Sequence, residues 1–170
     1  MPSKKQVKDS AAHSHVTHDS ERPSKKVAFP IVGVGASAGG LAAFEAFFSG
    51  MPADIEPGMA FVLVQHLAPD HNSILSELIR RCTRMQVFEV EDGMKVQNNC
   101  VYIIPPNRDL AFLNYTLQLL EPIAPRGQRL PIDYFFRTLA EDQGEHAIGI
   151  VLSGMGSDVA NLKTTAKRVG

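Results

Sequence analysis

The chain has 170 residues, of which 44% are apolar and 21% are charged, and its formal net charge is −1. This composition is typical of one soluble globular domain and argues against a nucleic-acid binder driven by bulk electrostatics. No apolar run approaches the roughly 20 residues that span a bilayer, no signal-peptide stretch follows Met1, and two cysteines, Cys82 and Cys100, make no disulfide framework. We therefore expect a reduced, cytoplasmic protein without membrane insertion.

Residues 1–26 differ from the rest of the chain. They carry six basic and three acidic side chains and no aromatic residue, so burial cannot offset the entropy that they would lose on ordering. We expect a disordered basic tail here, followed by one domain over residues 27–170. His13, His15 and His18 lie in this tail, but no cysteine or carboxylate completes a familiar ligand spacing, and a solvated tail is favoured over a metal site.

From residue 29 onward, patterns typical of strands and helices alternate along the chain. Short apolar runs rich in β-branched residues predict buried strands, and apolar residues three and four positions apart predict helices. The expected elements are a strand at 29–35, a helix at 39–49, a strand at 59–65, a helix from residue 72 or 73 to 82, strands at 87–90 and 100–104, a hairpin over 109–120, a helix beginning at Pro131, a strand at 146–152, and a last helix after the loop 153–158. This order predicts an α/β fold: a doubly wound, mostly parallel sheet with helices on both faces and an antiparallel hairpin.

The glycine-rich segment 33–40 is expected to join the first strand to the first helix. Gly33, Gly35 and Ala38 match a loose dinucleotide-binding pattern, but the second strand is not followed by the carboxylate that would hold a ribose. A second interpretation is that these small residues only let the helix pack against the sheet. A third interpretation takes the segment as a turn that carries a nucleophile.

This third interpretation rests on three polar residues that follow the ends of buried strands. Gly35-x-Ser37-x-Gly39 matches the sharp turn that presents a nucleophilic serine at a helix N-terminus. His66 directly follows the second strand, and Asp158 follows the last one. Because the carboxyl ends of parallel strands share one edge, we expect Ser37, His66 and Asp158 to meet as a nucleophile, a general base and the group that orients the base. Their chain order differs from the Ser, Asp, His order of the α/β hydrolases.

Four motifs occur in collinear order between about residue 27 and residue 170. They are Gly35-Ala36-Ser37-Ala38-Gly39-Gly40, Val64-Gln65-His66-Leu67, Val101-Tyr102-Ile103-Ile104-Pro105-Pro106-Asn107 and Leu152-Ser153-Gly154-Met155-Gly156-Ser157-Asp158. Together they resemble the CheB-type protein-glutamate methylesterase domain of bacterial chemotaxis. The segments 105–110 and 127–144 further resemble the methylesterase part of CheB/CheR fusion proteins, in which a methyltransferase domain follows on the same chain.

The resemblance implies a serine esterase that hydrolyses glutamate methyl esters on chemoreceptors to glutamate and methanol during sensory adaptation. Ser37 would be the nucleophile, His66 the general base and acid, and Asp158 the group that orients His66. The backbone N–H groups of Ala38 and Met155 would form the oxyanion hole. The implied partners are the methylated cytoplasmic helices of chemoreceptors, with no nucleic acid, no metal and no cofactor.

Two departures from the family pattern keep an alternative open. Val159 stands where the family has a glycine after the aspartate, and the sequence ends at Gly170, whereas the family domain continues with a further strand and helix that we expect this sheet to lack. The alternative is a catalytically impaired module that only binds a receptor or a partner domain. Standalone members also carry a receiver domain ahead of the catalytic domain, where this sequence has the tail, so we do not expect phosphorylation-gated control within the chain.

Overall fold

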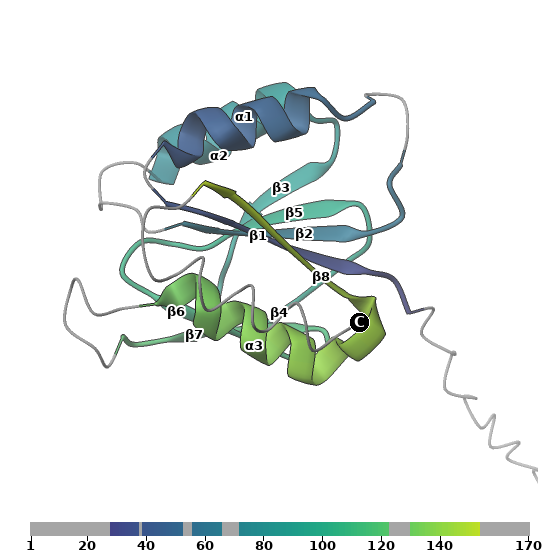
Figure 1. Cartoon of the computed structure of the whole chain (residues 1–170), viewed down its shortest axis with the longest axis vertical. Coiled ribbons are helices and arrows are strands. Elements are labelled where there is room, and N and C mark those ends of the chain that lie inside the picture. The colour runs from purple at the N-terminus through teal and green to yellow at the C-terminus, as the bar shows by residue number, and fades with distance from the viewer. Residues whose placement is uncertain (1–27, 38, 53–55, 66–71, 123–129, 154–170) are drawn as a thin grey trace, which may run out of the picture.

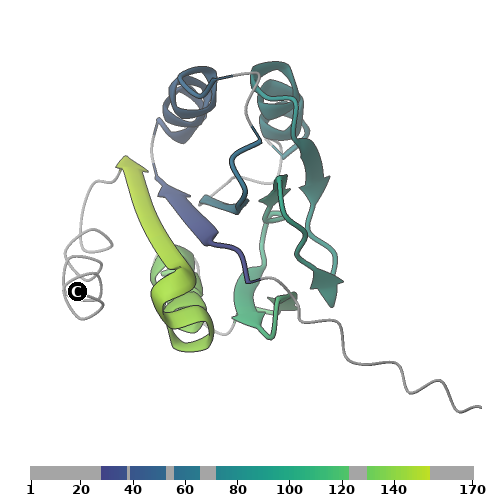
Figure 2. The same ribbon diagram turned by 90° about the vertical axis from the view of Figure 1, so that its right-hand side faces the viewer.

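The chain folds into three layers, which Figures 1 and 2 show from two directions. A computed structural model describes residues 28–37, 39–52, 56–65, 72–122 and 130–153. In this part of the chain, a five-stranded parallel sheet forms the middle layer, two helices cover one face, and a third helix and a small antiparallel sheet cover the other. The predicted doubly wound α/β fold with an antiparallel hairpin is therefore confirmed.

The strands of the central sheet run in the order β3-β5-β2-β1-β8, and every adjacent pair is parallel. Their bounds are β1 Ile31–Ala36, β2 Ala60–Gln65, β3 Gln86–Glu89, β5 Cys100–Ile103 and β8 Ala147–Ser153. The small antiparallel sheet has the order β4-β7-β6, with β4 Met94–Lys95, β6 Asp109–Leu113 and β7 Thr116–Leu120. The helices are α1 Gly40–Ser49, α2 Asn72–Cys82 and α3 Pro131–Gln143, and a 3-10 turn over Gly144–His146 leads into β8.

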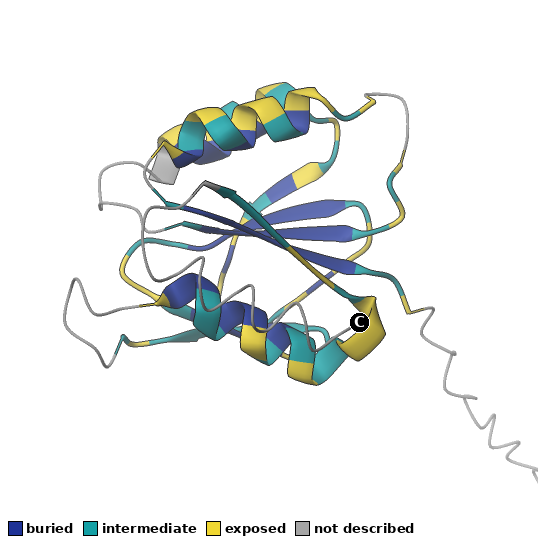
Figure 3. Ribbon diagram, viewed as in Figure 1, coloured by how far each residue is buried: buried dark blue, intermediate teal, exposed yellow. Residues whose placement is uncertain are grey.

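Alternation along the strands divides the buried side chains between two cores, one on each face of the sheet. Figure 3 shows the central strands buried between helices whose outer faces are exposed. On the α1 and α2 face, Val32 and Val34 of β1 belong to the same cluster as Phe44 and Phe48 of α1. On the opposite face, the next residues along each strand meet α3 and the small sheet through side chains such as Phe135. β1, β2 and β5 are buried on both faces, which explains why they read as continuous apolar runs. The prediction of a buried strand at 146–152 is wrong in this respect, because β8 lies at the edge of the described sheet, where Ile148 is exposed and the rest of the strand up to Leu152 is at most partly buried.

The glycines of β1 let α3 approach the sheet closely. An ideal Cβ atom built on Gly35 would lie 2.5 Å from Cγ2 of Ile132, and one on Gly33 would lie 2.9 Å from Cε1 of Phe136. Both distances are shorter than the 3.5–4.0 Å of ordinary carbon contacts. These contacts support the packing interpretation for Gly33 and Gly35, because both glycines lie within β1 and side chains of α3 fill the space beside them.

The structure differs from the sequence-based expectation in two local features. β1 continues to Ala36, so the turn into α1 is much shorter than the expected loop over 33–40. β4 was not predicted, because a two-residue strand leaves no periodic pattern. The expected hairpin is present, and its two turn residues, Asn114 and Tyr115, both have positive φ, as a type I′ turn requires. The expected tail over 1–26 and the last helix lie outside the described residues.

Candidate active site

Ser37 lies at the junction between the central sheet and α1. It is the first residue after β1, it is half-buried, and its carbonyl oxygen accepts a hydrogen bond from the N–H of Gly40, the first residue of α1, at 3.0 Å. Gly39 caps the helix with a φ of 80°, a left-handed conformation that glycine adopts without strain. The predicted strand–turn–helix placement of Ser37 is thus confirmed, and it sets the serine at a helix N-terminus, where backbone N–H groups favour negative charge.

β1 occupies the position in the sheet at which α/β proteins bind their ligands. Its neighbour β2 is reached through α1 on one face of the sheet, and its other neighbour β8 is reached through α3 on the opposite face (Figure 1). The strand order therefore reverses at β1, and a crevice outside the carboxyl ends of the strands is expected at such a reversal. Ser37 stands at the carboxyl end of this strand.

The carboxyl ends of β2 and β8 meet β1 beside Ser37. Ala36, the last residue of β1, is in register with Gln65 on β2 and with Ser153 on β8. The pairing with β8 is irregular, because Gly35 faces Val151 and the next residue already faces Ser153. This places one extra residue in β8 at the edge that carries Ser37, and bulges of this kind commonly redirect a strand next to an active site.

The other predicted site residues lie just beyond these strand ends in the sequence. His66 follows the last residue of β2, and Met155 and Asp158 follow β8 by two and five positions. Ala38, His66, Met155 and Asp158 are outside the described residues. Their roles as oxyanion donors, general base and orienting carboxylate stay predictions, whereas the convergence of the three strands that precede them is observed.

Gln65 is a further residue at this edge that the sequence analysis did not single out. An ideal Cβ atom on Gly40 would lie 2.3 Å from Nε2 and 2.8 Å from Cδ of Gln65, so the side-chain amide packs directly on the first residue of α1. Its Oε1 atom is buried and has no hydrogen-bond partner in the described part of the chain. The only signal in the sequence was a polar residue closing an otherwise apolar strand.

The described residues offer no alternative centre for metal chemistry. Within them, no group of three or more histidine, cysteine, aspartate or glutamate side chains is placed to hold a metal ion. Burial raises the pKa of the Cys100 thiol and raises the pKa of Tyr102 to about 12, so both groups stay protonated at neutral pH. Both residues belong to β5, and the catalytic roles predicted for this chain do not involve them.

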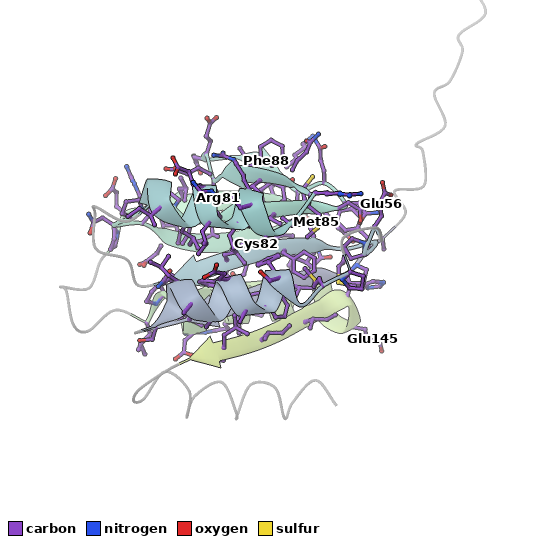
Figure 4. The ribbon with its side chains drawn as sticks, turned by 90° about the horizontal axis from the view of Figure 1, so that it is seen from above. Glu56, Arg81, Cys82, Met85, Phe88 and Glu145 are labelled. Atoms are coloured by element: carbon purple, nitrogen blue, oxygen red, sulfur yellow. The ribbon has the colours of Figure 1, made fainter. Side chains whose placement is uncertain are left out.

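A cavity lies at the opposite end of the sheet. It has a volume of about 600 Å³ and lies between the C-terminal ends of α1 and α2 and the first residues of β3 and β5. In Figure 4, its lining residues Glu56 and Met85 lie at the end of the molecule away from the arrowhead of β8. Since Ser37 follows the carboxyl end of β1, this cavity is separate from the candidate active site.

No described helix combines the length and hydropathy needed to cross a membrane.

Comparisons of sequence and of fold with known proteins point to the same family. A model of the CheB methylesterase family matches residues 32–170. The fold is similar to the crystal structure of the Thermotoga maritima CheB methylesterase catalytic domain, with a TM-score of 0.72 and 26% identity, covering 85% of this chain and 77% of that one.

Curated relatives show the same similarity in sequence. A protein-glutamate methylesterase/protein-glutamine glutaminase of Yersinia pestis is 31% identical over 134 residues, which are 76% of this chain and 38% of the relative. A protein of the same name from Bdellovibrio bacteriovorus is 33% identical over 144 residues, which are 82% of this chain and 40% of the relative. The chain thus spans well under two thirds of the length of these relatives. The extent of the family match shows that the chain belongs to the CheB methylesterase family.

Proposed function

We propose that this chain is a serine hydrolase that removes methyl groups from glutamate methyl esters on the cytoplasmic helices of chemoreceptors. The observation that carries the proposal is the position of Ser37, at the carboxyl end of β1, at the N-terminus of α1, and beside the carboxyl ends of β2 and β8. Family membership and the names of the relatives, protein-glutamate methylesterases, support the same reaction.

The chemistry follows from the groups predicted at this edge. A serine hydroxyl is a weak nucleophile until a positioned base removes its proton, and His66 is the predicted base. Attack of Ser37 Oγ on the ester carbonyl forms a tetrahedral oxyanion, which N–H donors at the start of a helix stabilise. Collapse of this intermediate breaks the bond to the methoxy oxygen, and the protonated base gives its proton to that oxygen, so methanol leaves and an acyl-enzyme remains.

Water then completes the reaction. The same base takes a proton from water, and the hydroxyl attacks the acyl-enzyme carbonyl. The bond to Ser37 Oγ then breaks and the base gives its proton to Oγ, which releases a free glutamate side chain and restores the serine. The relatives' names also include glutaminase activity. Hydrolysis of a glutamine side-chain amide would follow the same two steps, with ammonia as the leaving group in place of methanol.

The test is labelling of Ser37 by a fluorophosphonate probe, combined with methanol release from a methylated chemoreceptor. We expect the wild-type chain to be labelled, and we expect Ser37→Ala to remove labelling and to slow methanol release by about 10⁴-fold or more. Ser49→Ala is the matched control, because Ser49 is an exposed serine at the other end of the same helix. A folded wild-type chain that takes up no probe would contradict the proposal and favour the alternative of a binding module.

A further inference from the structure

The side chain of Gln65 contacts the turn that carries Ser37. Gln65 closes β2 in register with Ala36, the residue before Ser37. Its amide group lies so close to the α-carbon of Gly40 that a methyl group there would be 2.3 Å from Nε2. The N–H of Gly40 in turn donates to the carbonyl oxygen of Ser37. A continuous chain of contacts therefore links the Gln65 amide to the backbone of the nucleophile.

The polar end of Gln65 is not explained by packing or by stability. Its Oε1 atom is buried, and no described residue donates a hydrogen bond to it. A buried acceptor without a partner costs about 1–3 kcal/mol, so a methionine, which is similar in length and apolar, would fill the same space at a lower cost. Nothing among the described residues offsets the cost of an amide at this position, and this points to a requirement of the site.

We propose that Gln65 is a positioning residue for the hydrolysis, and this inference rests on the function proposed above. The amide holds the turn from Ser37 to Gly40 against the end of β2, and its carbonyl oxygen is an acceptor at the edge where Ser37 reacts. Gln65 acts through the orientation of Ser37 and not on the substrate. Catalysis depends steeply on such orientation, since a displacement of about 1 Å can reduce a rate by about 100-fold.

The first experiment compares reactivity with stability in Gln65→Met. The rate constant for fluorophosphonate labelling of Ser37 reports its orientation without a receptor substrate, and urea unfolding reports stability. We expect labelling to be at least about tenfold slower than in wild type, while the urea midpoint is equal or higher. Gln86→Met is the matched control, an exposed glutamine at the first position of β3, and it should leave the labelling rate unchanged.

The second experiment tests whether Gln65 acts through Gly40. Gly40→Ala introduces a methyl group into the space of the amide, and we expect it to slow labelling in the wild-type background. In the Gln65→Ala background the amide is absent and the nearest other neighbour of the new methyl group is the Cβ atom of Ala36 at 3.1 Å, so Gly40→Ala should cause a clearly smaller loss. With a methylated receptor, Gln65→Ala should lower kcat with little change in KM, because the turn and not the bound ester is disturbed.

The outcomes separate this inference from the proposed function. A folded wild-type chain that is not labelled overturns the proposed function, and this inference with it. A labelled wild-type chain whose Gln65→Met and Gln65→Ala variants react within about twofold of its rate overturns this inference alone. Equal slowing by Gly40→Ala in both backgrounds also overturns it, because the two residues would then act independently.

Discussion

Replacing Gly35 by alanine should push α3 away from the central sheet. The new methyl group would lie 2.5 Å from Cγ2 and 3.4 Å from both Cγ1 and Cδ1 of Ile132, a side chain that is 3% exposed. Ordinary carbon contacts require about 3.5–4.0 Å, so one of the two elements must move by about 1 Å. Overpacking of this kind costs about 1–3 kcal/mol, and the lower chain entropy of alanine returns about 0.4–1 kcal/mol. We therefore expect a net destabilisation of about 1–2 kcal/mol.

Urea unfolding of Gly35→Ala, Ile132→Ala and the double variant measures this effect. Ile132→Ala alone should cost about 2–5 kcal/mol through the cavity that it leaves. In that background the alanine at Gly35 enters vacated space, so adding it should be neutral or stabilising. Gly149→Ala is a control with a milder clash, because its methyl group would lie 3.1 Å from the ring of Phe136. It should destabilise the protein less than Gly35→Ala does. An unchanged midpoint for Gly35→Ala, or strictly additive effects of the two substitutions, would refute the contact between β1 and α3.

Two further predictions concern buried polar groups on the α3 side of the sheet. The Tyr102 hydroxyl accepts a hydrogen bond from the Gln97 N–H at 2.8 Å, and its pKa is raised by burial to about 12. The unfolded state loses this proton first, near pH 10, so the stability of the wild type should fall as the pH rises from 10 towards 12. The urea midpoint of Tyr102→Phe should be lower than that of the wild type at pH 7, and it should fall less than the wild-type midpoint between about pH 10 and 12. Thr138→Val should cost about 1–2 kcal/mol, because the Phe112 N–H loses the Oγ1 acceptor that it contacts at 3.1 Å. Faster hydrogen exchange at the Phe112 amide would accompany that loss, and an unchanged exchange rate would contradict it.

The sequence predicted the larger elements of this fold well because their patterns are long and consistent. β1 and β2 are apolar runs buried on both faces, β8 is an apolar run that is only partly buried, and α3 combines a proline at its first turn with an apolar stripe. The serine turn was predictable because glycine spacing around a serine reports backbone geometry directly. These signals are local, so a single sequence contains them.

Other features depend on contacts between distant residues and left little local signal. Gly33 and Gly35 appeared to belong to a loop, because the sequence does not show that side chains of α3 fill the space beside them. The extra residue in β8 next to Ala36 depends on the register of two strands more than 100 positions apart. Gln65 could not be recognised either, since its closeness to Gly40 arises only when β2 aligns with β1.

The position of β1 between β2 and the outer strand β8 has a consequence for how the protein should lose activity on heating. Both edges of β1 are hydrogen-bonded along its full length, to β2 on one side and to β8 on the other. Fraying of β3, an outer strand, leaves both partners of β1 in place, whereas β8 is itself the outer strand on the other side of the described sheet, so its fraying frees one edge of β1. Loss of activity on heating should therefore follow the opening of β8 and not that of β3, and the amides of β8 should exchange with solvent before those of β2.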